Sequence, residues 1–570
     1  MTRFRLFAAL LLTVGVAWPA SAADPVISSV VAALRAEGSP VVAGTTLSSR
    51  KMLPELYERR GFEPLWSSTA SANLLKAIED SVALGFVPED YHLAALRRLH
   101  ASGGSTPELD LVLTDAFVRL AYHHRFGKVD PERLDANWNH QRPIASADPA
   151  ASLQAAIDGQ DIASFLEGLG PRTVFYGRLR EALDEYRRLE AAGGWPSVPA
   201  GPTLEPGDDD PRVPALRRRL VAGGDLSGDD ASEPPAAALE VIAPSGEAAS
   251  GASRQSPGKP TAASSASTRG TPYDEALVRG VQVFQRRHGL KDDGIVGPGT
   301  LHELNVPVSH RIDQIRASLE RARWVQHDLP ERFVFVNVAG FKAYFYEHGV
   351  VTWESRVVVG KPYTETPIFR ADMKYVVLNP TWTIPSSIVR NEVLPGIRRD
   401  PNYMAKKGFV RVDGQFVQPA GPKNALGRIK LMFPNPHSVY LHDTPSKSFF
   451  NETTRTFSHG CIRVEKPVEL AALALGDPAW TAETLEREIA NGKTRTVNLR
   501  TPLPVLILYW TAMKTGDGVV RFLPDIYGRD PAIIRALDEA PRPPMRPPVR
   551  RPAVSSTGSS PVEAPAQRRE

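Results

Sequence analysis

The residue best suited to chemistry is Cys461, the single cysteine of the 570-residue chain. A thiolate attacks carbonyl carbons, whereas an unperturbed thiol with a pKa of about 8.5 is mostly protonated at neutral pH. A histidine must therefore take the proton, and an acceptor on its far nitrogen must fix its tautomer. His459 lies two residues before Cys461 and His442 lies 19 residues before it, so the residue types alone do not decide which histidine is the base. Gly460 has no side chain, so a substrate carbonyl could approach the amides of Gly460 and Cys461 as an oxyanion hole.

The cysteine count also excludes other chemistries. One cysteine forms no internal disulfide and supplies neither a Cys₂ zinc site nor an iron–sulfur site. Glycoside hydrolysis needs two suitably spaced carboxylates, and no sequence signal singles out such a pair. Cysteine, histidine and backbone donors supply every role in acyl transfer, so we expect no cofactor and no metal.

A mostly β domain must position these residues. Alternating side chains from Val334 to Val338, followed by strand-like runs on both sides of a turn at 347–349, predict a β-hairpin. Further strand-like runs follow at 355–359, 374–378 and 438–441, and the last of these places His442 at a strand end. We therefore expect a catalytic domain over 311–530. The stretch at about 384–437 is rich in Gly, Pro and Asn and lacks clear strands, so it is predicted to be a lid.

The preceding part of the chain has helical periodicity. Apolar residues such as Leu74 and Ile78 recur at three-to-four spacing, which predicts an N-terminal helical scaffold domain over 23–204. Helical patterns return at 213–220 and 273–289, within a predicted domain over 205–310. The segment 229–271 between them is dominated by Ala, Ser, Pro, Gly and Thr. It cannot bury enough apolar area to offset its ordering entropy, so a disordered insertion is predicted there. The fold class is multidomain α+β.

The two ends of the chain differ from these domains. Residues 1–22 combine Arg3 and Arg5 with an apolar run and Ala20-Ser21-Ala22, which is typical of a Sec signal peptide. No later run of about 18 apolar residues exists, so we expect no integral membrane segment after cleavage. Residues 531–570 are predicted to be a disordered Pro/Arg-rich tail that contacts anionic polymers weakly.

The net charge of +4 is concentrated at these ends. The part of the tail from 541 to 570 has six arginines and two glutamates, and the signal peptide has two arginines, so about −2 remains on the folded body. This balance disfavours nucleic acid as a partner.

Two blocks of sequence resemble known families. Residues 283–290 (VFQRRHGL) with 293–298 (DGIVGP) resemble the small three-helix peptidoglycan-binding domain. Residues 458–462 (SHGCI), preceded by His442, resemble the signature of the YkuD-type L,D-transpeptidases, as do 379–385 (NPTWTIP) and 441–445 (LHDTP). The architecture is similar to that of the large periplasmic YcbB-like members of this family.

The resemblance implies a role for each residue of the motif. Cys461 would be the nucleophile and His442 the general base, held by the backbone carbonyl of Asp443. The oxyanion hole would comprise the amides of Gly460 and Cys461, with Tyr440 as a helper. His459 would then be a positioning group. The supporting and substrate-contacting residues would include Ser458, Arg463 and Trp382; Arg463 either meets a stem-peptide carboxylate or lies at the surface.

The implied activity is ping-pong acyl transfer on peptidoglycan stem peptides in the periplasm, which would form 3→3 cross-links. An L,D-carboxypeptidase and a protein-anchoring transpeptidase use the same chemistry with another acceptor. A non-catalytic cell-wall-binding scaffold is the alternative of another class. The sequence leaves the acceptor and the oligomeric state open.

Overall fold

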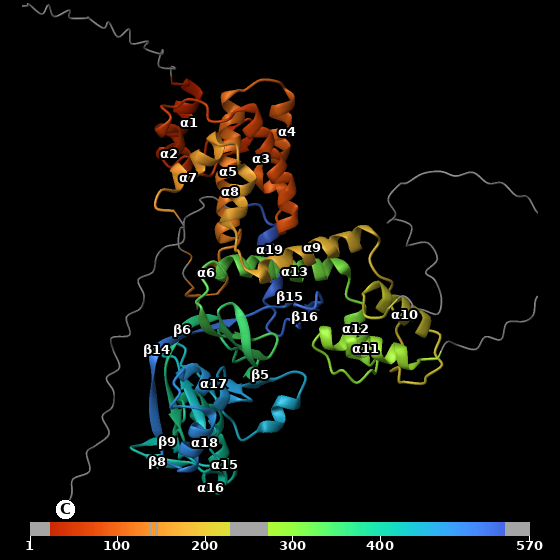
Figure 1. Cartoon of the computed structure of the whole chain (residues 1–570), viewed down its shortest axis with the longest axis vertical. Helices are drawn as coiled ribbons and strands as arrows, with labels where there is room; N and C mark the ends of the chain where they lie inside the picture. Colours follow the sequence, from red (N-terminus) through yellow and green to blue (C-terminus); the bar gives the residue numbers. More distant parts are fainter. Residues whose placement is uncertain (1–22, 136–137, 141, 143–145, 228–271, 542–570) are drawn as a thin grey trace, which may run out of the picture.

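A computed structural model describes residues 23–135, 138–140, 142, 146–227 and 272–541 (Figure 1). The predicted signal peptide at 1–22 lies outside the described residues, as do the whole of the predicted insertion at 229–271 and the tail from 542. None of the described helices is long and apolar enough to cross a membrane.

The N-terminal region is helical, as predicted. Its longest helix, α5 (Pro107–Phe126), is buried on nearly every side by the helices packed around it. The other elements of this region are α1 (Pro25–Arg35), β1 (Val41–Val42), β2 (Thr45–Thr46), α2 (Met52–Arg59), α3 (Ser68–Asp80), two 3₁₀ turns at Ser81–Leu84 and Pro88–Tyr91, α4 (Leu93–Ala101), α6 (Pro131–Leu134), α7 (Pro149–Asp158) and α8 (Ile162–Leu169).

Two long helices form a layer between this region and the β domain (Figure 1). They are α9 (Val174–Ala191) and α13 (Val308–Val325), which pack along each other. Buried residues of both helices, such as Leu179 and Ile315, belong to the same hydrophobic core as the β domain. Helix α9, predicted as part of the scaffold domain, therefore shares its core with the catalytic part of the chain.

Three helices form a small domain beside this layer: α10 (Val213–Ala222), α11 (Glu275–Arg287) and α12 (Pro298–Leu304). Phe284 is fully buried in its core, and Pro298 occupies the first turn of α12 as the sequence indicates. Arg287 anchors the domain, because its guanidinium donates to Asp225 at 2.8 Å, to the Tyr186 hydroxyl at 2.7 Å and to the Val520 carbonyl at 3.0 Å.

The predicted catalytic region contains a nine-stranded sheet in the order β12-β5-β13-β11-β10-β6-β14-β3-β4, and β4 also pairs with β5, so the sheet closes on itself. The predicted hairpin is confirmed. The strands are β3 (Arg332–Asn337), β4 (Lys342–Glu347), β5 (Val350–Gly360), β6 (Phe369–Leu378), β10 (Ile429–Met432), β11 (Leu441–His442), β12 (Thr456–Ser458), β13 (Ile462–Val464) and β14 (Arg495–Leu508). Helices α17 (Pro467–Leu475) and α18 (Ala482–Ala490) cover it, and a 3₁₀ turn spans Lys447–Asn451.

The lid prediction is wrong in two respects. The stretch contains strands, since β7 (Trp382–Thr383), β9 (Gln415–Gln418) and β8 (Val410–Val412) form a separate three-stranded sheet. The stretch that lies outside the central sheet also ends before residue 429 and not at about 437, because β10 pairs with β6 and β11 of that sheet. We call residues 382–427 the cap. Its helical part comprises α14 (Ser386–Ile388), a π-helical turn at Val389–Val393, α15 (Leu394–Arg399) and α16 (Tyr403–Lys407).

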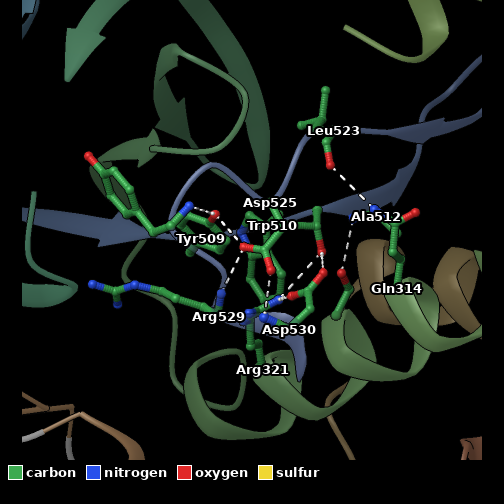
Figure 2. Close-up of polar contacts among 12 residues, drawn as sticks. Gln314, Arg321, Tyr509, Trp510, Ala512, Leu523, Asp525, Arg529 and Asp530 are labelled. Atoms are coloured by element: carbon green, nitrogen blue, oxygen red, sulfur yellow. Dashed lines mark hydrogen bonds and ion pairs between the residues drawn. The ribbon is translucent and has the colours of Figure 1, made fainter. Parts of the chain in front are cut away.

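The predicted start of the disordered tail at 531 is also wrong. Residues Asp530–Asp538 form α19, which buries Ile533 and Leu537, after a hairpin of β15 (Ala512–Lys514) and β16 (Val520–Phe522). Figure 2 shows how the helix is anchored: Asp530 meets Arg321 of α13 at 2.6 Å and accepts from the Thr511 hydroxyl at 2.7 Å. Because Asp530 is buried, this ion pair anchors the first turn of α19 to α13.

Candidate active site

The register of two short parallel strands brings the predicted nucleophile and base together. Leu441 pairs with Ile462, and His442 pairs with Arg463. Because side chains alternate along a strand, Tyr440, His442, Cys461 and Arg463 share the outer face of the sheet, while Leu441 and Ile462 are buried on the inner face. The Tyr440 and His442 rings lie 5.5 Å apart on this face.

His442 is held in one tautomer. The ring is 4% exposed, and Nδ1 lies 2.5 Å from the Asp443 carbonyl oxygen. A carbonyl only accepts, so Nδ1 carries the proton and Nε2 of the neutral ring is left as a base. Burial, assisted by the Arg463 cation, lowers the pKa of His442 to about 3. The imidazole is therefore neutral at physiological pH.

Asp443 is itself fixed. Its buried carboxylate accepts from the Arg428 amide at 2.9 Å and from Lys447 Nζ at 2.5 Å, and its amide donates to the Ile429 carbonyl at 2.9 Å. The close approach of the Asp443 carboxylate to the backbone requires glycine at 427, because a Cβ there would lie 2.5 Å from Asp443 Cγ. The φ of Gly427 is also +62°, which favours glycine. A side chain at 427 would displace the group that orients His442.

Cys461 is partly exposed, and its thiol donates weakly to the Ser438 carbonyl at 3.6 Å. Desolvation raises the pKa of the Cys461 thiol, while hydrogen bonds from Tyr440 and the cations Lys430 and Arg463 oppose that rise. The same burial raises the pKa of Tyr440, so its hydroxyl is a proton donor beside the sulfur. The resting pair is a neutral thiol and a neutral imidazole.

The Gly460 amide, which the family resemblance implies as an oxyanion donor, already has an acceptor in this structure. Its N–H donates to Ser458 Oγ at 3.1 Å, and Ser458 Oγ donates to the Cys461 carbonyl at 2.5 Å. Ser458 therefore braces the turn, and Gly460 adopts a φ of +107° that favours glycine. In the part of the chain that the structure describes, nothing accepts from the Cys461 amide, which remains the backbone donor available to an oxyanion.

His459 points away from the sulfur toward the cap. Its Nε2 lies 2.5 Å from Oε1 of Glu392, in the π-helical turn. The ring is partly exposed and contacts neither Cys461 nor His442 through a hydrogen bond. The geometry thus separates the two histidines: His442 lies on the strand beside the nucleophile, and His459 joins the catalytic turn to the cap.

Trp382 lies on β7 of the cap, beside the catalytic face. Its buried Nε1 forms no hydrogen bond of normal geometry among the described residues, but it interacts with the Tyr440 hydroxyl, and this interaction opposes the rise in the pKa of that phenol. Because this contact with Tyr440 is poorly aligned, the indole N–H can instead donate to a substrate carbonyl.

Arg463 extends from β13 toward the Phe449 ring, with Cζ 5.6 Å from its centroid. Its Nε is buried without a partner, and the described residues include no carboxylate paired with it. Burial lowers its pKa. An uncompensated guanidinium beside the thiol suits a substrate carboxylate.

Sequence reasoning missed Lys430. It lies on β10 directly opposite His442, with Nζ 3.9 Å from the centroid of the Tyr440 ring. Burial lowers its pKa, and the Cys461 thiolate would raise it, so Lys430 is a cation that stabilises negative charge at the sulfur. The alternation of Ile429, Lys430 and Leu431 was the available signal, but it lay within the predicted lid.

Residues far along the chain support the catalytic turn. The Thr366 hydroxyl donates to the Gly460 carbonyl at 2.9 Å, and Tyr527 Oη donates to the Gly360 carbonyl at 2.7 Å and accepts from the Thr366 amide at 3.2 Å. The Tyr527 amide in turn donates to Tyr509 Oη at 3.0 Å. Tyr509 belongs to the network in Figure 2, where it donates to Asp525 at 2.6 Å.

Three family models match successive parts of the chain. They are "Scaffold domain" over residues 51–183, "Putative peptidoglycan binding domain" over 262–304, and "L,D-transpeptidase catalytic domain" over 331–504. The third match contains Cys461, His442 and every other residue of the site described above except Tyr509, Asp525 and Tyr527.

The chain also resembles individual proteins. It is 34% identical over 217 residues to a Haemophilus influenzae protein named "Putative L,D-transpeptidase", a match that covers 35% of this chain and 44% of that relative, so the chain spans less than half of the relative's length. A crystal structure of an L,D-transpeptidase from Xylanimonas cellulosilytica is 16% identical, covering 54% of this chain and 99% of that one with a TM-score of 0.18. A crystal structure of an Enterococcus faecium L,D-transpeptidase mutant is 12% identical, and the match covers 34% of this chain and 62% of that one with a TM-score of 0.15. The chain thus carries a YkuD L,D-transpeptidase catalytic domain, joined to a helical scaffold region and a peptidoglycan-binding domain.

Proposed function

We propose that the protein is an L,D-transpeptidase that forms 3→3 cross-links in peptidoglycan outside the cytoplasm, in the periplasm. The observation that carries this proposal is the strand register that sets His442 beside Cys461, with Nδ1 of His442 fixed by the Asp443 carbonyl. The cationic Arg463, whose buried Nε has no partner among the described residues, supports a peptide substrate that bears a carboxylate.

In the first half-reaction, the Cys461 sulfur attacks the carbonyl carbon of the third residue of a donor tetrapeptide stem. His442 Nε2 takes the thiol proton as the C–S bond forms, and the Cys461 amide and the Tyr440 hydroxyl stabilise the oxyanion. The C–N bond to D-alanine then breaks, and the proton passes from His442 to the leaving amine. A thioester on Cys461 remains.

In the second half-reaction, the side-chain amine of a diaminopimelate residue on an acceptor stem attacks the thioester. His442 takes a proton from this amine, the C–S bond breaks, and the thiol is restored. Water in place of the amine would release a tripeptide stem, which is the carboxypeptidase outcome. Lys430 would stabilise the thiolate as it leaves.

Mass spectrometry of disaccharide-tetrapeptide muropeptides tests this proposal. Native protein should form an acyl adduct at Cys461 that has lost D-alanine, followed by a 3→3 dimer, and Cys461→Ala should form neither. Tripeptide alone would identify a carboxypeptidase, and no adduct would refute the enzymatic proposal. Activity retained in His442→Ala but lost in His459→Ala would overturn the assignment of the base.

A further inference from the structure

A short loop between β5 and β6 holds the catalytic turn. We call residues 361–366 the β5–β6 loop. The hydroxyls of Thr364 and Thr366 donate to two carbonyls of the turn, that of Ser458 at 3.2 Å and that of Gly460 at 2.9 Å. Because both hydrogen bonds come from one loop, the position of the loop sets the position of the turn.

Arg529 joins this loop to the N-terminal region. Its Nη2 donates to Glu365 Oε2 of the loop at 2.7 Å, and its Nη1 donates to Asp135 Oδ2 at 3.0 Å. Asp135 directly follows α6, so one guanidinium bridges two carboxylates that are remote in the chain. The three side chains are 18–35% exposed, so the bridge is partly shielded from solvent ions. A planar guanidinium with several donors in a fixed fork is suited to hold both carboxylates at once.

The C-terminal segment orients Arg529. The Arg529 amide donates to Asp525 at 2.9 Å, within the network of Figure 2. Its Cζ lies 5.6 Å from the ring centroids of both Tyr509 and Tyr527, a distance at which an aromatic ring attracts a cation. The guanidinium is therefore oriented by its own backbone and by two rings, in addition to the two carboxylates.

A second contact ties the N-terminal region to the strand that follows the loop. The Asn139 side chain exchanges two hydrogen bonds with the Arg370 backbone near the start of β6, each 2.8 Å long. The neighbouring Trp138 is buried and packs edge-on against Trp324 of α13, with ring centroids 5.5 Å apart. The part of the N-terminal region that contacts the loop is therefore itself anchored.

These contacts connect the N-terminal region to the backbone that presents the nucleophile. We propose that Arg529 is a positioning residue: it holds the β5–β6 loop through Glu365 and thereby places the catalytic turn, with Asp135 as its second anchor. A misplacement of reacting atoms by about 1 Å can slow an enzyme by about 100-fold, so a small movement of this loop should slow acylation more than it weakens substrate binding. The proposal rests on the proposed function, because the rate of acylation is one of its two readouts.

The test applies two measurements to variants of the full chain. The first is kcat and KM for release of D-alanine from the disaccharide-tetrapeptide. The second is amide hydrogen exchange, followed by mass spectrometry, in peptides that cover 361–366 and 456–464. Arg529→Gln should lower kcat by about tenfold with little change in KM, and exchange in both peptides should become faster. Arg521→Gln is the matched control and should behave as native protein, because Arg521 lies in the same C-terminal segment and pairs with Asp517 of its own hairpin.

Further variants separate positioning from a general loss of stability. Glu365→Ala should slow acylation by about the same factor as Arg529→Gln, and it replaces that variant in the test if Arg529→Gln does not fold. The double variant should be no slower than either single variant, because both residues act through one contact. Asp135→Asn should slow acylation by about threefold, the effect of losing one partly exposed ion pair. Arg529→Lys should not restore the native rate, since an ammonium lacks the fork that bridges two carboxylates.

Four outcomes would overturn the proposal in whole or in part. Unchanged kcat and unchanged exchange in folded Arg529→Gln would do so, and so would fully additive effects of Arg529→Gln and Glu365→Ala. Equal losses of kcat and thermal midpoint in Arg529→Gln and Arg521→Gln would indicate general destabilisation. A native rate in Asp135→Asn would remove the N-terminal region from the proposal. If native protein released no D-alanine while Arg529→Gln exchanged faster in both peptides, the proposed function would fail and the positioning role would stand.

Discussion

The neutral state of the His442–Cys461 pair predicts how the thiol responds to pH. The pKa of His442 is about 3, against an ordinary value of 6.5, because the ring is buried and faces Arg463. At about 1.4 kcal/mol per pKa unit, this environment disfavours the imidazolium by about 5 kcal/mol. Desolvation also raises the pKa of Cys461. Both effects oppose a resting thiolate–imidazolium pair, so proton transfer must accompany attack on the carbonyl.

The assay is the rate of alkylation by iodoacetamide from about pH 4 to about pH 10, with Cys461→Ala as the blank. Because the thiolate is the reactive species, the rate should rise in a single step above about pH 9. At neutral pH it should be severalfold below that of a free cysteine. His442→Ala should change this profile little, since the neutral ring does not hold the resting proton of the thiol.

A reactive plateau at acid pH would refute this reasoning if it disappeared in His442→Ala, because it would mean that the resting pair is ionised. His459→Ala serves as the control for the second histidine. It removes the contact with Glu392 without touching the sulfur, so its alkylation profile should match that of the native protein.

Three further predictions concern stability. The Gly427→Ala variant should lower the free energy of unfolding through left-handed backbone strain of about 1–2 kcal/mol and a clash with Asp443 of about 1–3 kcal/mol. Urea unfolding measures this loss. Displacement of Asp443 should also slow acylation, which is measured as the rate of adduct formation. Asp530→Leu should destabilise by about 3–5 kcal/mol because it leaves Arg321 unpaired, whereas the double variant with Arg321→Met should recover most of that loss in its urea midpoint. Burial lowers the pKa of His124 from 6.5 to about 3. The contribution of the neutral ring to the free energy of unfolding is therefore complete above about pH 6.5 and is lost as the pH falls toward 3. At about pH 5 the loss should be about 2 kcal/mol, and His124→Gln should show a shallower decline in thermal midpoint; an equal decline would contradict this assignment.

The sequence predicted those features whose cause is local. The hairpin with its turn at 347–349 follows from the strand-like runs on both sides of that turn. The neighbourhood of His442 and Cys461 followed from the family resemblance, and the parallel register that produces it depends on long-range pairing that periodicity does not reveal.

The errors arose where pairing or packing is distant in sequence. Strand β10 has four residues and is fixed by β6 on one side and β11 on the other, so Lys430 looked like part of a lid. For α19, a local signal existed: Pro531 follows Asp530 at the first turn, and Ile533 and Leu537 are spaced for one helical face. The Pro/Arg-rich composition downstream concealed that signal, and its anchor, Arg321, is remote along the chain.

The catalytic turn also depends on residues beyond the matched catalytic domain. Gly460 is held through its carbonyl by Thr366, and Thr366 and Gly360 are both held by the Tyr527 hydroxyl, which lies after residue 504. Gly360 has no room for a side chain, since a Cβ there would lie 2.1 Å from the Thr364 carbonyl oxygen, so this turn cannot shift to compensate for a lost partner. The C-terminal segment through Tyr527 is therefore part of the catalytic domain in a physical sense, because it fixes the backbone that presents Cys461.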